Sequence, residues 1–266
     1  MKSMSKNYIS NLYSSTKTKI KKILTKLFTR YINNSVEPIL QYETLNQFDP
    51  FDLIFVVGGG TDIDQFVKHS PKAKFHIFEP NPINFKLLKK RVSKQINNFE
   101  VHQIALGASN KKALMTLNST GSSLNDFNER WVGIKNSSLE KIEIDMMKLD
   151  SFTKLRNLNT SSSQKILLAI DTEGSEVSVL KGASEFLKNV DIIIAESRII
   201  PGFTNSYSFD ELISFINKMN FSTGLIAEVG PPWKRKNKSD TQSRVYRYLD
   251  ILFFNKSKFS DFYSEI

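Results

Sequence analysis

The chain has 266 residues, 40% of them hydrophobic and 24% charged, which is typical of a globular protein with a substantial core. It contains no cysteine, and this excludes disulfides, thiolate nucleophiles and zinc sites built on cysteine. No apolar run approaches the roughly 20 residues of a membrane-spanning helix, and the polar first 20 residues predict no secretory signal, so we expect a cytoplasmic protein.

The net charge of +10 is concentrated at the N-terminus, where residues 1–36 hold eight Lys and Arg and no acid. Apolar residues recur there at helical spacing, namely Ile20, Ile23, Leu24, Leu27, Phe28, Tyr31 and Ile32. We therefore predict a basic helical arm over residues 1–45, followed by one domain over residues 46–266.

The apolar stripe of this arm could pack on the domain. Alternatively, residues 17–32 could contact an anionic membrane surface or a protein partner, because one helix face is basic and the other apolar. No basic motif with interleaved aromatic residues accompanies the arm, so we expect no nucleic acid partner.

From Phe51 onward, short β-rich runs alternate with helical stretches. In chain order we predict strand Leu53–Val57, helix Asp62–Lys68, strand Lys74–Glu79, helix Ile83–Ser93, strands Glu100–Ala105, Lys112–Asn118, Leu139–Asp145 and Lys165–Asp171, helix Ser175–Leu187, strand Asp191–Glu196, helix Phe209–Met219, and strands Phe221–Ala227 and Tyr248–Phe254. Such alternation predicts an α/β fold, with a mostly parallel sheet covered by helices on both faces. The last two strands leave no room for a helix between them and should pair antiparallel.

The strands at 112–118 and 139–145 interrupt the alternation. We interpret them as an insertion after the third strand, on the side of the sheet where loops build sites. A simple surface hairpin is the alternative.

The stretch LIFVVGGGTDIDQF, Leu53–Phe66, sets an apolar run against three glycines. A phosphate loop of the ATPase kind is excluded, because no Gly-Lys-Ser/Thr ending follows. The dinucleotide fingerprint G-x-G-x-x-G is matched at Gly58 and Gly60 but has Ile63 at its third glycine. Backbone without side chains at Gly58–Gly60 would let a ligand approach the strand end.

Downstream, in KFHIFEPNP, Glu79 ends the second predicted strand 19 residues after Gly60. A carboxylate at this place can accept hydrogen bonds from both ribose hydroxyls of an adenosine. This indicates an adenosine cofactor, which could be NAD or S-adenosylmethionine.

In LLAIDTEGSEVSVLKGA, Asp171 and Glu173 end the fourth predicted strand, opposite the glycine stretch. Two carboxylates there could orient and deprotonate a substrate hydroxyl, or hold a cation that does so. Glu176 falls in the first turn of the next helix, where the helix dipole favours an acid. Glu196 closes the fifth strand of the alternation and could bind substrate or pair with Arg198.

The chain has three histidines, His69, His76 and His102, and their spacing is not typical of a metal site. We therefore predict no metal.

Taken in order, the glycine turn, FEPNPINFKLLKK, IALG, GSSL, LDSF, IDTEGSEVSVLKGA and IIIAES resemble the FkbM family of S-adenosylmethionine-dependent methyltransferases. The resemblance runs from about Phe51 to Phe254. It implies a class I methyltransferase fold, a Rossmann-like sheet that is mostly parallel with an antiparallel final strand. It also implies O-methylation of a hydroxyl on a sugar, a glycan or a small metabolite.

The resemblance also implies roles for individual residues. The cofactor would lie over the turn and the two neighbouring strand ends, at Gly58, Gly59, Gly60, Glu79, Pro80, Asn81, Ala105 and Leu106. Asp171, with Glu173 beside it, would hold or deprotonate the acceptor. Substrate contacts would come from Ser122, Ser123 and Glu196.

The chain departs from the family in the glycine motif, which commonly reads D-x-G-A-x-x-G. Val56 stands where the acid would be, and Asp62 replaces the closing glycine. Asp62 or Asp64 could approach the cofactor's ammonium group instead, although helix capping by Thr61, with Asp64 at the third helical position, is an alternative.

These departures motivate a rival hypothesis, a protein that binds the cofactor or a partner without turnover. A second rival, an NAD-dependent oxidoreductase, rests on Gly58, Gly60 and Glu79. It lacks a Tyr-x-x-x-Lys or histidine arrangement suited to hydride transfer.

Overall fold

The computed structural model describes residues 45–58, 63–118, 121–129, 135–158, 160–161, 163–198, 202–229 and 248–259. Residues 1–44 of the predicted arm lie outside the described residues, as do Gly59, Gly60 and Asp62. No helix in the described ranges is long and apolar enough to cross a membrane.

A seven-stranded sheet forms the centre of the described fold, in the order β3-β2-β1-β7-β8-β10-β9. Its strands are β1 (Leu53–Gly58), β2 (Lys74–Phe78), β3 (Phe99–His102), β7 (Ile166–Asp171), β8 (Ile192–Arg198), β9 (Phe221–Val229) and β10 (Tyr248–Asn255). The first five in this order pair in parallel, and β10 pairs antiparallel with both β8 and β9. The predicted α/β sheet and the antiparallel pairing of its last two strands are confirmed.

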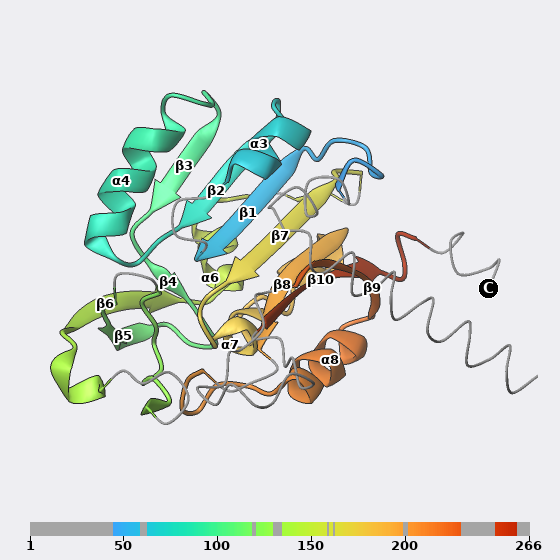
Figure 1. Ribbon diagram of the computed structural model, residues 1–266. Coiled ribbons are helices and arrows are strands. Elements are labelled where there is room, and N and C mark those ends of the chain that lie inside the picture. The colour runs from blue at the N-terminus through green and yellow to red at the C-terminus, as the bar shows by residue number, and fades with distance from the viewer. Residues whose placement is uncertain are drawn as a thin grey trace, which may run out of the picture. The chain divides into compact units, whose positions relative to one another are not determined.

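Helices cover both faces of this sheet (Figure 1). One face carries α3 (Asp64–His69) and α4 (Pro82–Val92), and the other carries α6 (Leu149–Leu155), α7 (Glu176–Lys181), the 3₁₀ turn η2 (Phe186–Asn189) and α8 (Phe209–Lys218). Because side chains alternate along a strand, Ile54 and Val56 of β1 pack on the α3 side, while Phe55 and Val57 pack on the α6 side. Burial on both faces explains why the strands read as continuous apolar runs.

The insertion forms a second sheet and not an isolated hairpin. Strands β5 (Lys111–Thr116) and β6 (Lys141–Met147) pair antiparallel, and β4 (Ala105–Leu106) pairs in parallel with β6. The predicted strand Glu100–Ala105 is thus divided between the two sheets, and β4 connects β3 of the main sheet to the insertion.

One predicted boundary is wrong, and one helix was not predicted. The predicted helix Ser175–Leu187 ends at Lys181. The chain after it passes close to another loop, since a Cβ at Gly182 would lie 2.0 Å from the carbonyl oxygen of Gly107. Helix α6 was not predicted from LDSFTKL. Its Asp150 carboxylate accepts hydrogen bonds from the amides of Glu185 and Phe186, which fixes α6 to η2.

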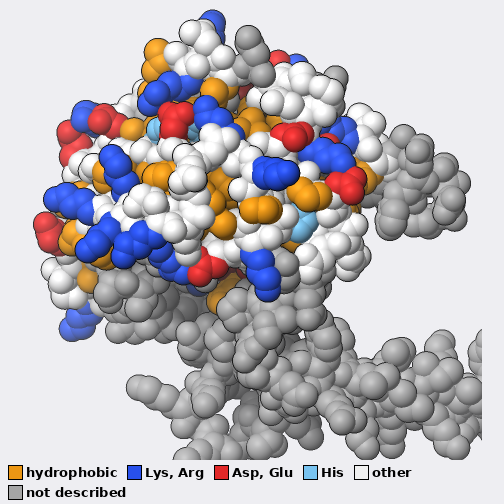
Figure 2. Space-filling model, turned by 90° about the horizontal axis from the view of Figure 1, so that it is seen from above, with side chains coloured by type: hydrophobic (Ala, Val, Ile, Leu, Met, Phe, Trp, Pro, Cys, Tyr) orange, Lys and Arg blue, Asp and Glu red, His pale blue; other side chains and the backbone are white. Residues whose placement is uncertain are grey.

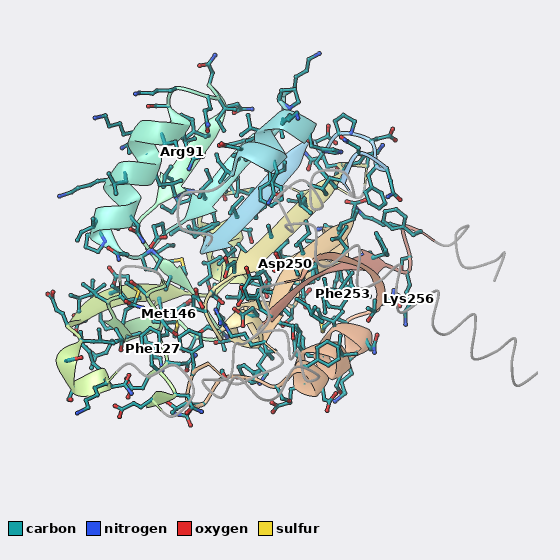
Figure 3. The ribbon with its side chains drawn as sticks, in the orientation of Figure 1. Arg91, Phe127, Met146, Asp250, Phe253 and Lys256 are labelled. Atoms are coloured by element: carbon teal, nitrogen blue, oxygen red, sulfur yellow. The ribbon has the colours of Figure 1, made fainter. Side chains whose placement is uncertain are left out.

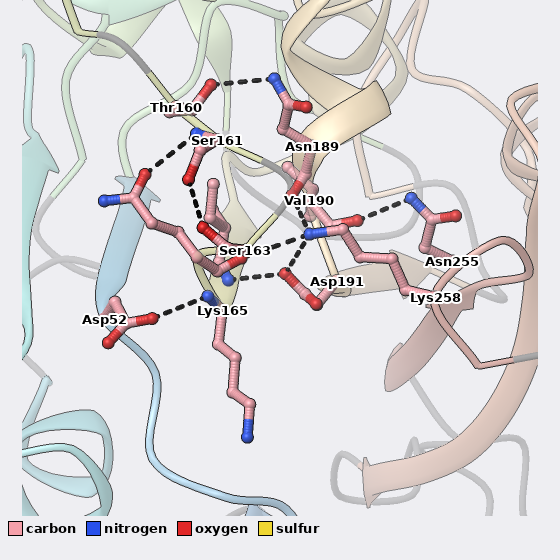
Figure 4. A network of polar contacts seen from close by, with 12 residues as sticks. Asp52, Thr160, Ser161, Ser163, Lys165, Asn189, Val190, Asp191, Asn255 and Lys258 are labelled. Atoms are coloured by element: carbon pink, nitrogen blue, oxygen red, sulfur yellow. Dashed lines mark hydrogen bonds and ion pairs between the residues drawn. The ribbon is translucent and has the colours of Figure 1, made fainter.

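Polar contacts link the chain segments at the N-terminal ends of β7 and β8 (Figure 4). Asp191 Oδ2 accepts hydrogen bonds from the amide of Ile166 at 2.7 Å and from Lys258 Nζ at 2.8 Å. Lys258 Nζ also donates to the carbonyl of Asn189 at 2.7 Å. The C-terminal end of the described chain is therefore tied to the start of the central strands.

Candidate active site

A cavity of about 330 Å³ lies where β1, β2 and β7 end, next to β4 and the insertion. Its volume falls at the lower end of the range for small-molecule sites. The lining includes eight of the residues predicted for the site, namely Gly58, Glu79, Pro80, Ala105, Leu106, Ser122, Asp171 and Glu173. Apolar walls come from Val57, Phe78, Ile104, Met115 and Leu124.

Gly58 ends β1 in the left-handed region, with φ +83°. A Cβ at this position would lie 1.7 Å from the carbonyl oxygen of Asp171, its partner on β7. Glycine is therefore required here by the pairing of two central strands as well as by any ligand. The same pairing brings Asp171 beside Gly58.

Glu79 follows β2 and is only 5% exposed. Its Oε1 accepts a hydrogen bond from the amide of Asn81 at 2.8 Å. Burial raises the pKa of Glu79 to about 7, although this hydrogen bond acts in the opposite direction. A buried carboxyl on the cavity wall is suited to bind a pair of hydroxyls.

Asn81 does not line the cavity but fixes two groups that do. Its Oδ1 accepts hydrogen bonds from the amides of Ile83 and Asn84 and so caps α4, and Pro82 follows at the first helical position. Its Nδ2 donates to Ser122 Oγ at 3.2 Å.

Carboxyl groups gather at the ends of β7, β8 and β10. Asp171 is exposed to the open cavity at the end of β7. The protein packed around it and the charges of Glu173 and Asp250 raise its pKa well above the usual value. Figure 3 shows Asp250 on β10, where it pairs in register with Glu196. Burial and the Asp171 charge likewise raise the pKa of Glu196.

Arg198 contributes a positive charge to this cluster. The sequence named it only as a possible partner of Glu196, and that pairing is confirmed: Arg198 forms ion pairs through Nε with Glu196 Oε1 at 2.9 Å and with Glu173. The second pairing was not predicted, because Glu173 lies in the turn after another strand, 25 residues away. Glu196 lies outside the described lining of the main cavity and borders a smaller one with Arg198.

The turn after β7 has a strained conformation, with φ +56° at Glu173 and +97° at Gly174. Glu176 supports it, since its Oε1 accepts hydrogen bonds of 3.0 Å from the amides of Thr172 and Gly174 and from the Thr172 hydroxyl. Glu176 therefore has a structural role in addition to its place in the first turn of α7.

The insertion is tied to this same turn. Ser123 is buried, and its Oγ donates to the carbonyl of Glu173 at 2.7 Å. Asn125 Nδ2 donates to the carbonyl of Gly174 at 3.1 Å. Of the two predicted serines, Ser122 lines the cavity, whereas Ser123 holds the loop that carries Glu173.

Val56, which stands in place of the acid in the family's glycine motif, is 3% exposed and packs in the core on the α3 side. Helix α3 begins at Asp64, so the prediction that this residue occupies the third helical position is wrong. The Asp64 carboxylate accepts hydrogen bonds from Arg91 at 2.7 Å and from Gln95 at 2.8 Å, and it does not line the cavity.

Comparison with known proteins assigns the central part of the chain. Residues 58–223 match the family model described as "Methyltransferase FkbM domain". A comparison with curated proteins found no match.

Several solved structures have a similar chain path. One is precorrin-6y C5,15-methyltransferase from Geobacter metallireducens GS-15 (9% identity, 83% of this chain and 91% of that chain covered, TM-score 0.40). Another is magnesium protoporphyrin IX methyltransferase from Synechocystis PCC 6803 with bound S-adenosylmethionine (8%, 83% and 78%, 0.43). A third is an rRNA methylase from Streptococcus thermophilus (9%, 82% and 96%, 0.41). At these identities and scores, the likeness carries no argument about substrate.

Proposed function

Because this chain belongs to the FkbM methyltransferase family, we propose that it transfers a methyl group from S-adenosylmethionine to a hydroxyl oxygen of a sugar, a glycan or a small metabolite. The methyl donor follows from the family, and the sheet order with antiparallel β10 is that of a class I methyltransferase. The family match gives no support to the NAD-dependent alternative.

The observation that carries the proposal is the meeting of three separate motifs in one cavity. Gly58, Glu79 and Asp171 come from three adjacent strands and all line it. The lining of the cavity suits the cofactor. It combines a buried acid for the ribose hydroxyls, apolar walls for the adenine, and carboxylates near the positively charged part of the cofactor.

In the proposed binding mode Glu79 accepts the ribose hydroxyls, Ala105 and Leu106 flank the adenine, and Gly58 leaves room for the amino-acid portion. Gly59 and Gly60 belong to the same proposed turn. The bound cofactor supplies a methyl group on a positively charged sulfur. The chain's main contribution is to hold the acceptor oxygen in line with that group.

Asp171 is the proposed general base, which takes the proton from the acceptor hydroxyl. Its raised pKa suits this role, because a base with a pKa nearer to the working pH retains more affinity for the proton. Glu173, held by Arg198, lies beside the acceptor with Ser122. In this scheme Ser123 and Glu196 do not contact the acceptor. Ser123 holds the turn that carries Glu173, and Glu196 pairs with Arg198.

The test is to incubate the purified chain with labelled S-adenosylmethionine and fractionated glycans and small metabolites. Transfer of label to a hydroxyl is expected. Cofactor binding without transfer to any fraction would favour the rival protein without turnover, and absence of binding at high cofactor concentration would contradict the proposal.

With an acceptor in hand, Asp171→Asn should lower methyl transfer at least about 100-fold, the usual contribution of a general base. Its cofactor affinity should stay close to that of the unmodified chain in a calorimetric titration. Asp145→Asn, at an exposed position of strand β6, is the matched control and should retain full activity. Equal turnover in both variants would exclude the proposed role of Asp171.

A further inference from the structure

Two histidines meet on the α6 side of the main sheet, away from the cavity lining. His76 lies on β2 and is fully buried, and His102 ends β3 and is 8% exposed. Nδ1 of His76 and Nε2 of His102 are 3.1 Å apart, although 26 residues separate them in the chain. The sequence spacing gives no sign of this pair.

Glu100 adds a third donor, since it pairs in register with His76 on the adjacent parallel strand. One ligand atom from each of the three residues can be chosen so that all lie within 4.8 Å of one another. We propose that His76, Glu100 and His102 bind one divalent metal ion of the zinc type.

The donor set suits such an ion. Zinc in proteins takes imidazole nitrogen and carboxylate oxygen, with Zn–N distances of about 2.0–2.1 Å. Two nitrogens on one tetrahedral zinc are therefore about 3.3 Å apart, close to the 3.1 Å between His76 and His102. Two imidazoles and one carboxylate leave the fourth position for water.

If Nδ1 of His76 binds the ion, the opposite nitrogen Nε2 carries the ring proton. Within the part of the chain that the structure describes, this Nε2 is buried without a hydrogen-bond partner. Such a group usually indicates a missing water, so Nε2 is not one of the ligand atoms. Phe152 of α6 packs edge-on against both rings, at centroid distances of 5.9 and 4.7 Å.

Lys74 and Arg156 approach Glu100 at 3.1 and 3.6 Å. They orient the carboxylate, as outer groups do around metal ligands, but their charge opposes a divalent ion. We therefore expect moderate affinity, and Lys74→Met should bind zinc at least as tightly as the unmodified chain, because it keeps all three donors.

The position of the site indicates a structural role. Strand β3 is the edge strand of the sheet, and the chain after it runs directly to Ile104, Ala105 and Leu106 on the cavity wall. An ion bound by both β2 and β3 would hold β3 on the sheet and raise the temperature of unfolding.

The test uses the full-length chain without a polyhistidine tag, stripped with a chelator and titrated with zinc against a chromophoric indicator. One zinc per chain is expected, with a rise in the unfolding temperature, and cobalt should give the intense visible absorption of a tetrahedral ion. His102→Gln should weaken zinc binding by more than about 100-fold.

His69→Gln is the matched control, because His69 is also 8% exposed and lies outside the cluster. It should bind zinc like the unmodified chain. If His102→Gln does not fold, the half-exposed Glu100→Gln gives the same decision. Absence of stoichiometric zinc in the unmodified chain, or equal affinity in the cluster variants and the control, would overturn the proposal.

Discussion

Glu79 shows how burial changes the chemistry of a single residue. In the sequence it is an acid after a strand, and in the fold it is a nearly inaccessible carboxyl with a pKa of about 7. Near neutral pH it is therefore divided between the carboxyl and carboxylate forms. The carboxylate is the better acceptor for two hydroxyl groups, so pH should control ribose binding.

We expect the affinity for S-adenosylhomocysteine to rise with pH through 7. A group with a pKa of about 7 is roughly one-tenth ionised at pH 6 and nine-tenths ionised at pH 8. If only the ionised form binds the ribose, the dissociation constant should be about tenfold larger at pH 6 than at pH 8.

Isothermal titration calorimetry at both pH values measures this difference. Glu79→Gln should bind more weakly, with little dependence on pH between these values. The same slope in Glu79→Gln as in the unmodified chain would assign the effect to another group, such as Asp171.

At the scale of elements, α4 connects helix capping to the site. The Asn81 side chain caps this helix and donates to Ser122 on the cavity wall, while the Asn81 backbone amide donates to Glu79. Helix α8 has a cap of similar kind in Ser208, whose capping box with Glu211 lies away from the main cavity. Comparing substitutions of the two caps therefore separates effects on stability from effects on cofactor binding.

Asn81→Ala and Ser208→Ala should each lower the free energy of unfolding by about 1 kcal/mol, the usual cost of losing a cap. Only Asn81→Ala should also weaken cofactor binding, because the alanine loses the side-chain contact to Ser122 on the cavity wall, although it keeps the backbone amide that donates to Glu79. Urea denaturation and calorimetry measure the two quantities. A loss of affinity in Ser208→Ala as large as that in Asn81→Ala would show that binding follows global stability.

At the scale of the whole described fold, the candidate binding site and a largely buried ion pair lie at opposite ends of the parallel strands. The cavity lies where the parallel strands end, and the Asp191–Lys258 pair lies where β7 and β8 begin (Figure 4). Both side chains of this pair are 14% exposed, so the interaction is screened little by solvent.

Lys258→Met should lower the free energy of unfolding by about 2–3 kcal/mol, because it leaves Asp191 buried without its cation. Cofactor affinity under native conditions should not change. Lys256→Met, two residues away and exposed, is the matched control and should stay within about 0.5 kcal/mol of the unmodified chain. A weaker cofactor affinity in Lys258→Met would show that the two ends of the parallel strands are coupled.

Most of the main sheet could be predicted because its strands are buried on both faces and are separated by polar or glycine-containing turns. Local pattern is sufficient there, and β1, β2, β7 and β8 begin and end within two residues of their predicted bounds. Helix α6 and the break after α7 could not be predicted in this way. They are accompanied by contacts between distant segments, namely Asp150 with η2 and Gly182 with Gly107, which a local pattern does not report.

The sequence by itself determined the family, the strand ends that carry the candidate site, and the residue types at Gly58, Glu79 and Asp171, since each of these depends on short local motifs. Only the tertiary structure decided which side chains act together. It placed Arg198 between Glu173 and Glu196, turned Ser123 toward the backbone, and joined His76 to His102. The physical reason is that charge pairing and burial depend on distances in space, which residues on neighbouring strands share whatever their separation in the chain.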